Sequence, residues 1–273
     1  MGAFFMPNSA FEGFWVASVV FSVLFIIVQA ILLVDFAYNM AEKIVSKYEE
    51  TGSAVYKYML ISITFLLNAL FIAATVYFYL RFTDSRSKAF ISVNLILGIV
   101  VQVCSILPAV QEANPRSGLF QSAILVGYTT FVTGTALMYR PFSVPQDPSA
   151  YDEFMLYAGL IITFVSLAYG AYSAGTSSGK IVISSSEGEE ADEDAGGEYN
   201  YSFFHFIFLS AACYVALLLT YWQKPYLDAE NVYKFSYNDG PVWVKICTSW
   251  VVYLLFSWTL LAPIMFPNRD FGV

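Results

Sequence analysis

The residues best suited to chemistry lie in a polar row along one predicted helix, which runs from Ala89 to Val110. At 100° per residue the row occupies an arc of about 80°, and the rest of the helix surface is mainly apolar. Its polar members are Asn94, Gln102, Ser105 and, just beyond Val110, Glu112, and the small residues Gly98 and Ala109 share the same arc. Amides, a hydroxyl and a carboxylate in such a row offer hydrogen bonds rather than a nucleophile with its base. The row predicts either a packing seam between helices or a polar surface that holds lipid headgroups or water inside a membrane.

A polar turn follows this helix and is the densest group of polar residues beside an apolar segment. Pro108 is expected to kink the end of the helix, and Asn114 followed by a proline predicts a turn. Glu112 and Arg116 are close enough in sequence to pair across it. Together with the polar row, this turn defines the candidate lipid path: Asn94, Gln102, Ser105, Glu112, Arg116, Gln121 and Ser122.

Two further residues are candidates for contact with lipid headgroups. His205 is the single histidine and is flanked by phenylalanines, which predicts an interfacial hydrogen-bonding residue rather than a catalyst. Lys245 follows closely on the start of a predicted span, so its ammonium group could reach the headgroups by extending along the helix. An anionic lipid is the more specific partner for that lysine.

The sequence indicates no enzyme, metal site or cofactor. It has neither a glycine-rich phosphate loop nor a nucleophile elbow, and no second histidine with ligand spacing around His205. The pI of about 4.6 and the absence of a basic patch disfavour a nucleic acid partner.

Seven hydrophobic stretches, each long enough to cross a bilayer as a helix, must position these side chains. Hydrophobic residues make up 58% of the chain and charged residues 12%, which predicts a polytopic all-α membrane protein. The predicted spans are Phe14–Phe36, Tyr58–Leu80, Ala89–Val110, Leu119–Tyr139, Phe154–Tyr172, Tyr201–Trp222 and Val242–Phe266.

The first span is expected to continue as one long tilted helix from Phe14 to about Tyr48. Amphipathic spacing persists beyond the apolar run, and neither proline nor glycine interrupts it. A helix of roughly 35 residues would be about 50 Å long, which exceeds the hydrocarbon thickness. It must therefore tilt or project from the membrane.

An acidic segment at residues 176–200 separates the fifth and sixth spans and is predicted to be a disordered loop. It carries seven of the 21 acidic residues among many serines and glycines, a composition that cannot bury a core. The lysines and arginines of all the loops divide almost evenly between the two sides, so the positive-inside rule leaves the orientation open.

Several stretches resemble the serine incorporator family. They are LLVDFA from Leu32, ISVNLIL from Ile91, VQEANPRSGLFQSA from Val110, YSFFHF from Tyr201, VWVK from Val242 and NRDF from Asn268. The resemblance covers the chain as a single transmembrane domain and implies two helical subdomains joined by a long diagonal helix. It also implies a cytosolic acidic loop and C-terminus, and it leads us to expect that the first three spans of the family are absent.

The resemblance implies two kinds of function. The first is phospholipid transport between leaflets, or scrambling, without catalysis, with membrane phospholipids as partners. The alternative is a carrier or scaffold that supports serine incorporation into phosphatidylserine and sphingolipids beside lipid-biosynthetic enzymes. A multi-pass protein of the endomembrane system or plasma membrane is expected in either case, and an oligomer is compatible with both.

Overall fold

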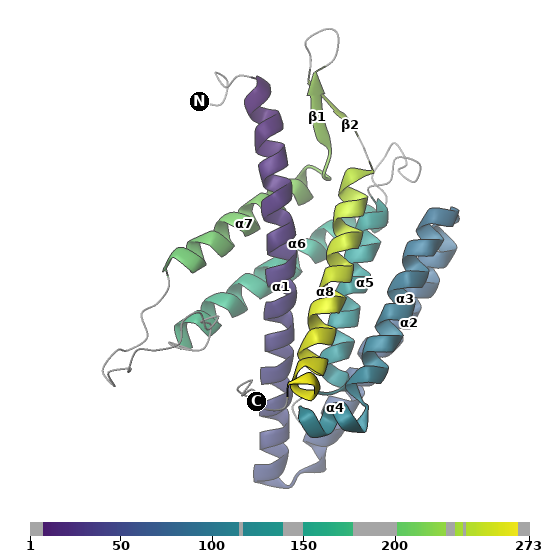
Figure 1. Cartoon of the computed structure of the whole chain (residues 1–273), viewed down its shortest axis with the longest axis vertical. Helices are drawn as coiled ribbons and strands as arrows, with labels where there is room; N and C mark the ends of the chain where they lie inside the picture. The colour runs from purple at the N-terminus through teal and green to yellow at the C-terminus, as the bar shows by residue number, and fades with distance from the viewer. Residues whose placement is uncertain are drawn as a thin grey trace.

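The computed structural model describes residues 8–114, 117–138, 150–176, 201–227, 233–236 and 239–266. Eight helices and one hairpin make up this part of the chain (Figure 1). The helices are α1 Asn8–Thr51, α2 Ala54–Arg81, α3 Ser85–Ser105, α4 Pro108–Ala113, α5 Leu119–Met138, α6 Ala150–Thr176, α7 Tyr201–Leu219 and α8 Gly240–Met265. The predicted helical membrane fold is therefore confirmed.

A short β-hairpin between α7 and α8 was not predicted. Strand β1 (Lys224–Leu227) pairs antiparallel with β2 (Tyr233–Ser236), with Lys224 opposite Ser236. The hairpin lies at the end of the molecule where α8 begins (Figure 1). Strands of four residues are too short for a clear alternating pattern in the sequence.

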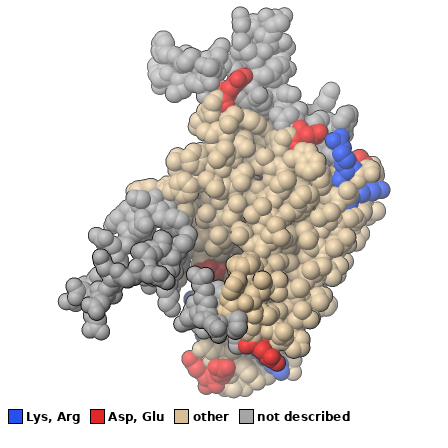
Figure 2. All heavy atoms as spheres, in the orientation of Figure 1, with Lys and Arg blue, Asp and Glu red and all other residues tan. Residues whose placement is uncertain are grey.

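Five of the helices are long and apolar enough to cross a membrane: α1, α2, α3, α6 and α8. Helix α7 also has an apolar part, from His205 to Leu219, but this part is shorter than those five helices. Charged side chains on the visible face gather near the two ends of the molecule, and its middle is almost entirely uncharged (Figure 2). This distribution suits a molecule whose middle lies in lipid.

Helix α5 lies at the centre of the bundle and contacts α1, α2, α3, α6 and α8. Nearly every side chain from Phe120 to Met138 is buried. Four threonines, Thr129, Thr130, Thr133 and Thr135, are among them. Because its neighbours screen α5 from lipid, this helix can be more polar than the five spans. Its lower mean hydropathy, which keeps it out of that group, is explained in this way.

The predicted long helix is confirmed and is longer than expected. Helix α1 has 44 residues, which corresponds to about 66 Å. It ends where Gly52 adopts a φ of +65° and its N–H donates to the Tyr48 carbonyl over 2.9 Å. Helices α6 and α7 slant across α1 on one side, and α2 to α5 and α8 lie on the other (Figure 1). Helix α1 contacts members of both groups and so joins them.

The predicted third span ends too late. Helix α3 stops at Ser105, and Pro108 starts the separate short helix α4 rather than bending a continuous one. Proline fits the first turn of a helix because its missing N–H would be unpaired there in any case. The predicted acidic loop lies outside the described residues, apart from Thr176 at the end of α6.

Candidate functional site

Asn94, the first residue of the predicted polar row, points into the bundle and links three helices. Asn94 on α3 is only 4% exposed. Its Nδ2 donates to Thr130 Oγ1 on α5 over 2.9 Å, and its Oδ1 accepts from the Tyr253 hydroxyl on α8 over 3.1 Å. The Tyr253 hydroxyl in turn accepts from Thr129 Oγ1 over 2.7 Å. These buried polar groups satisfy one another, which favours the packing-seam interpretation for this part of the row.

Further along the row, Gln102 bridges α3 and α2 at the edge of the bundle. Its Nε2 donates to Asn68 Oδ1 over 2.6 Å, and both residues are only half-buried. Nearer the α2–α3 turn, the hydroxyls of Tyr79 and Ser92 also meet across the same pair of helices. We call these four residues the α2–α3 seam. On α3, Gln102 is the member of the predicted row that reaches the outer surface.

The polar turn after α3 is held mainly by its own hydrogen bonds. Gln111 Nε2 donates to the carbonyls of Ser105 and Ser117, over 2.6 and 2.8 Å. Ser105 Oγ lies 3.0 Å from Ser122 Oγ on α5. Carbonyls at the end of a helix need such partners, and Gln111, which the sequence did not single out, supplies them. The described part of this turn is therefore a structural joint.

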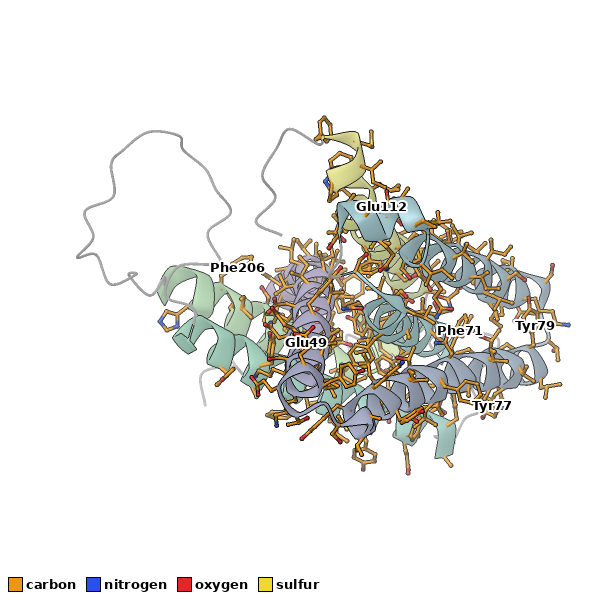
Figure 3. All side chains as sticks on the ribbon, turned by 90° about the horizontal axis from the view of Figure 1, so that it is seen from below. Glu49, Phe71, Tyr77, Tyr79, Glu112 and Phe206 are labelled. Carbon is orange, nitrogen blue, oxygen red and sulfur yellow. The ribbon has the colours of Figure 1, made fainter. Side chains whose placement is uncertain are left out.

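The remaining candidates in the turn do not form one surface. Gln121 is buried, whereas Glu112 is exposed on α4 and is labelled at the near end of the molecule in Figure 3. Arg116 lies outside the described residues, and so does its predicted pairing with Glu112.

Lys245 occupies a different place from the predicted headgroup contact. The side chain is 1% exposed. Its Nζ donates to Thr135 Oγ1 over 3.1 Å and lies 4.9 Å from the centroid of the Trp222 ring. A hydroxyl and an aromatic face thus surround the amino group of Lys245 inside the bundle, and the side chain does not extend to the surface. His205 is exposed near the start of α7, where contact with headgroups stays a prediction.

A second polar cluster joins α1 to α6 and was missed at the level of sequence. The Tyr169 hydroxyl donates to Asp35 Oδ2 over 2.5 Å. Asn39 Nδ2 donates to the same hydroxyl over 2.7 Å and to the Asp35 carbonyl over 3.0 Å. Asp35 and Asn39 are one helical turn apart, which was the available signal, but nothing in the sequence indicated the partner on α6.

Comparison with known proteins identifies the family of this chain. The profile of the family described as serine incorporator (Serinc) matches residues 1–194 and 182–269. The chain belongs to the serine incorporator family. It is 36% identical to a probable serine incorporator of Nematostella vectensis, with the whole chain aligned to 70% of that protein. It is 33% identical to human serine incorporator 2, with the whole chain aligned to 68% of it.

A fungal relative extends the comparison. The chain is 34% identical to a membrane protein of Schizosaccharomyces pombe, over 98% of this chain and 67% of the relative. Three of the stretches that first indicated the serine incorporator family each contain one residue of the polar contacts described above. Asp35 lies in LLVDFA, Asn94 in ISVNLIL and Lys245 in VWVK.

Proposed function

We propose that this serine incorporator moves phospholipids between the two leaflets of its membrane without covalent catalysis. The observation that carries the proposal is the half-buried amide pair of Asn68 and Gln102 on the α2–α3 seam. A polar pair at a lipid-facing edge can exchange its hydrogen bonds with a passing headgroup, whereas the buried Asn94 contacts cannot do so without opening the bundle.

The depth of the amide pair supports this proposal. Asn68 precedes the end of α2 at Arg81 by 13 residues, which places it about 20 Å along the helix from the α2–α3 turn. The hydrocarbon layer is about 30 Å thick, so the pair lies well inside it. The Tyr79 and Ser92 pair lies about 16 Å closer to the turn, as 11 residues separate Asn68 from Tyr79. The seam thus offers polar contacts at two depths.

The surroundings of the seam suit lipid tails. Exposed apolar residues flank it on both helices, including Phe65 and Ile72 on α2 and Ile99 and Val103 on α3. A headgroup that follows the seam could therefore leave its acyl chains in the bilayer. On α2, Phe71 lies one helical turn after Asn68, points in among the helices (Figure 3) and belongs to the apolar core.

The proposed orientation places the C-terminal ends of α6 and α8 toward the cytosol. Both helices end in the lower half of Figure 1. The acidic stretch that follows α6 and the chain after α8 therefore leave the bundle on the same side. Labelling of a cysteine introduced at Glu112, on α4 at this same end, by a membrane-impermeant maleimide in intact and permeabilised cells tests the orientation.

Transport is tested in liposomes that contain the purified protein and fluorescently labelled phospholipid. An impermeant reductant should bleach well over half of the label, because lipids from the inner leaflet reach the outside. Replacing both Asn68 and Gln102 by leucine should slow exchange about 5-fold, which corresponds to a loss of about 1 kcal/mol from hydrogen bonds along the route. The double change of Ile72 and Ile99 to leucine is the matched control.

Two outcomes contradict the transport proposal. If bleaching with the unmodified protein stops at the half of the label in the outer leaflet, the protein does not transport phospholipids. If exchange is unchanged in the Asn68 and Gln102 variant, the α2–α3 seam is not the route. The carrier or scaffold alternative predicts instead that labelled serine binds to the protein or enters the vesicles while phospholipids stay in their leaflets.

A further inference from the structure

We propose that Asp35, Asn39 and Tyr169 form a binding site for a primary ammonium group, such as that of an aminophospholipid headgroup. We call these three residues the α1–α6 site. The inference rests on the proposed function, because it names the class of lipid that the protein would hold. It concerns a different pair of helices from the α2–α3 seam.

The first argument is the unbalanced charge of Asp35. Arg86 forms an ion pair with Asp239, but neither a lysine nor an arginine of the described part of the chain pairs with Asp35. The Tyr169 hydroxyl occupies Asp35 Oδ2 alone. Asp35 Oδ1 accepts no hydrogen bond among the described residues and is not sealed inside the protein. A carboxylate held in a membrane helix without a cation is a candidate for a cationic ligand.

The second argument is how the site is held in place. Tyr169 donates to Asp35 and accepts from Asn39, so one hydroxyl orients both side chains. The Phe36 ring packs edge-on against Tyr169 with 5.2 Å between centroids, which restricts the tyrosine. Asn39 is exposed. Its Nδ2 makes both of its hydrogen bonds, so its Oδ1 accepts no hydrogen bond within the described structure. Two oxygen acceptors thus stand ready for the N–H groups of one ammonium.

The third argument is the level of the site in the membrane. Asp35 lies at the end of the apolar stretch Phe14–Phe36, where α1 becomes amphipathic. Tyr169 precedes the end of α6 at Thr176 by seven residues, or about 10 Å. Both helices therefore place the site near one boundary of the hydrocarbon layer. The ammonium group of a phospholipid lies at this level when its tails are in the adjacent leaflet.

The chemistry of the site selects among headgroups. Its carboxylate repels a phosphate that lacks an accompanying amine. A quaternary ammonium carries the same charge as a primary one but has no N–H to donate to Asp35 or Asn39. The site should therefore prefer ethanolamine and serine headgroups over choline and glycerol headgroups. Free serine and free ethanolamine share the same ammonium, so the experiment has to separate these sources.

Native mass spectrometry of the whole chain in mild detergent tests the preference. The protein is offered phosphatidylethanolamine, its mono- and dimethyl derivatives and phosphatidylcholine, all with identical acyl chains. Retention should fall with each added methyl group. The change Asp35→Asn should lower retention of phosphatidylethanolamine about 10-fold and flatten the series, because the charge-assisted hydrogen bond is lost. The change Glu49→Gln removes a carboxylate from an exposed position of the same helix and should have no effect.

A second variant keeps the proposal open to refutation if Asp35→Asn fails to fold. Tyr169→Phe retains the charge of Asp35 and the ring packing but removes the orienting hydroxyl, so it should lower retention about 3-fold. Equal retention of phosphatidylethanolamine by the unmodified protein and a folded variant overturns the site, as does a flat methylation series. Displacement of the lipid by millimolar serine identifies a free amine as the ligand, whereas resistance to serine identifies the lipid.

The two proposals fail separately. If lipid exchange in liposomes is absent but phosphatidylethanolamine is still retained, the transport proposal is wrong and the proposal of an ammonium site stands. Normal exchange with identical retention by Asp35→Asn removes the site and leaves transport.

Discussion

Replacing Gly134 by alanine is expected to lower the free energy of unfolding by about 2 to 3 kcal/mol, because it overpacks the contact between α5 and α2. A Cβ atom at this position would lie 2.5 Å from Cζ of Phe78, and two other atoms of that ring would lie 3.1 and 3.2 Å away. Atoms do not approach so closely, so the ring or the helix has to move.

Phe78 has little freedom to make that move. It is 3% exposed, and its ring packs edge-on against Tyr77, Phe82 and Tyr151. The Tyr151 hydroxyl on α6 also donates to the Gly134 carbonyl over 2.9 Å. The glycine thus lies where α2, α5 and α6 meet, and displacement of one helix disturbs the other two.

Gly127 on the same helix is the matched control. An added Cβ there meets nothing within 4 Å. The change Gly127→Ala should therefore leave stability unchanged or raise it by up to about 1 kcal/mol, through the better helix propensity of alanine. Unfolding in increasing fractions of sodium dodecyl sulfate measures both variants. Equal stability of the two would show that α2 and α5 are not packed as closely as described.

Replacing Asn94 by leucine should cost about 2 kcal/mol, because it leaves several buried polar groups without a partner. The Thr130 hydroxyl loses the Asn94 amide as a donor, and the Tyr253 hydroxyl loses its 3.1 Å acceptor. Interhelical hydrogen bonds in membranes are individually modest, so the effect depends on the loss of more than one contact at once.

Tyr253→Phe provides the comparison for Asn94. It removes the hydroxyl that joins Asn94 to Thr129 but leaves the bond between Asn94 and Thr130, so it should cost about half as much. The same detergent unfolding measurement applies. An Asn94→Leu variant with unchanged stability and slowed lipid exchange would reverse the interpretation, since it would make Asn94 part of the route and not of the packing.

These expectations separate two uses of polar residues within one bundle. The contacts of Asn94 are sealed and stabilise α3 against α5 and α8. The amide pair of Asn68 and Gln102, and the α1–α6 site, lie at edges where lipid can reach them. Variants of the first kind should change stability, and variants of the second kind should change lipid exchange or lipid retention.

The sequence by itself determined the class of fold, the long first helix and the inward polar face of α3. These follow from the membrane as solvent, because each span must be apolar over a set length and must satisfy its backbone hydrogen bonds internally. Helical periodicity then indicates which side chains share a face, as it did for Asn94 and Gln102.

Only the tertiary structure decided which partner each face meets. The predicted surface position of Lys245 is replaced by burial against Trp222 and Thr135, which come from regions 23 and 110 residues away in the chain. Tyr169 meets Asp35 across 134 residues for the same reason. Hydropathy and periodicity describe one helix at a time, whereas these contacts depend on the tilt and close approach of two helices, set by packing such as that of Gly134 against Phe78.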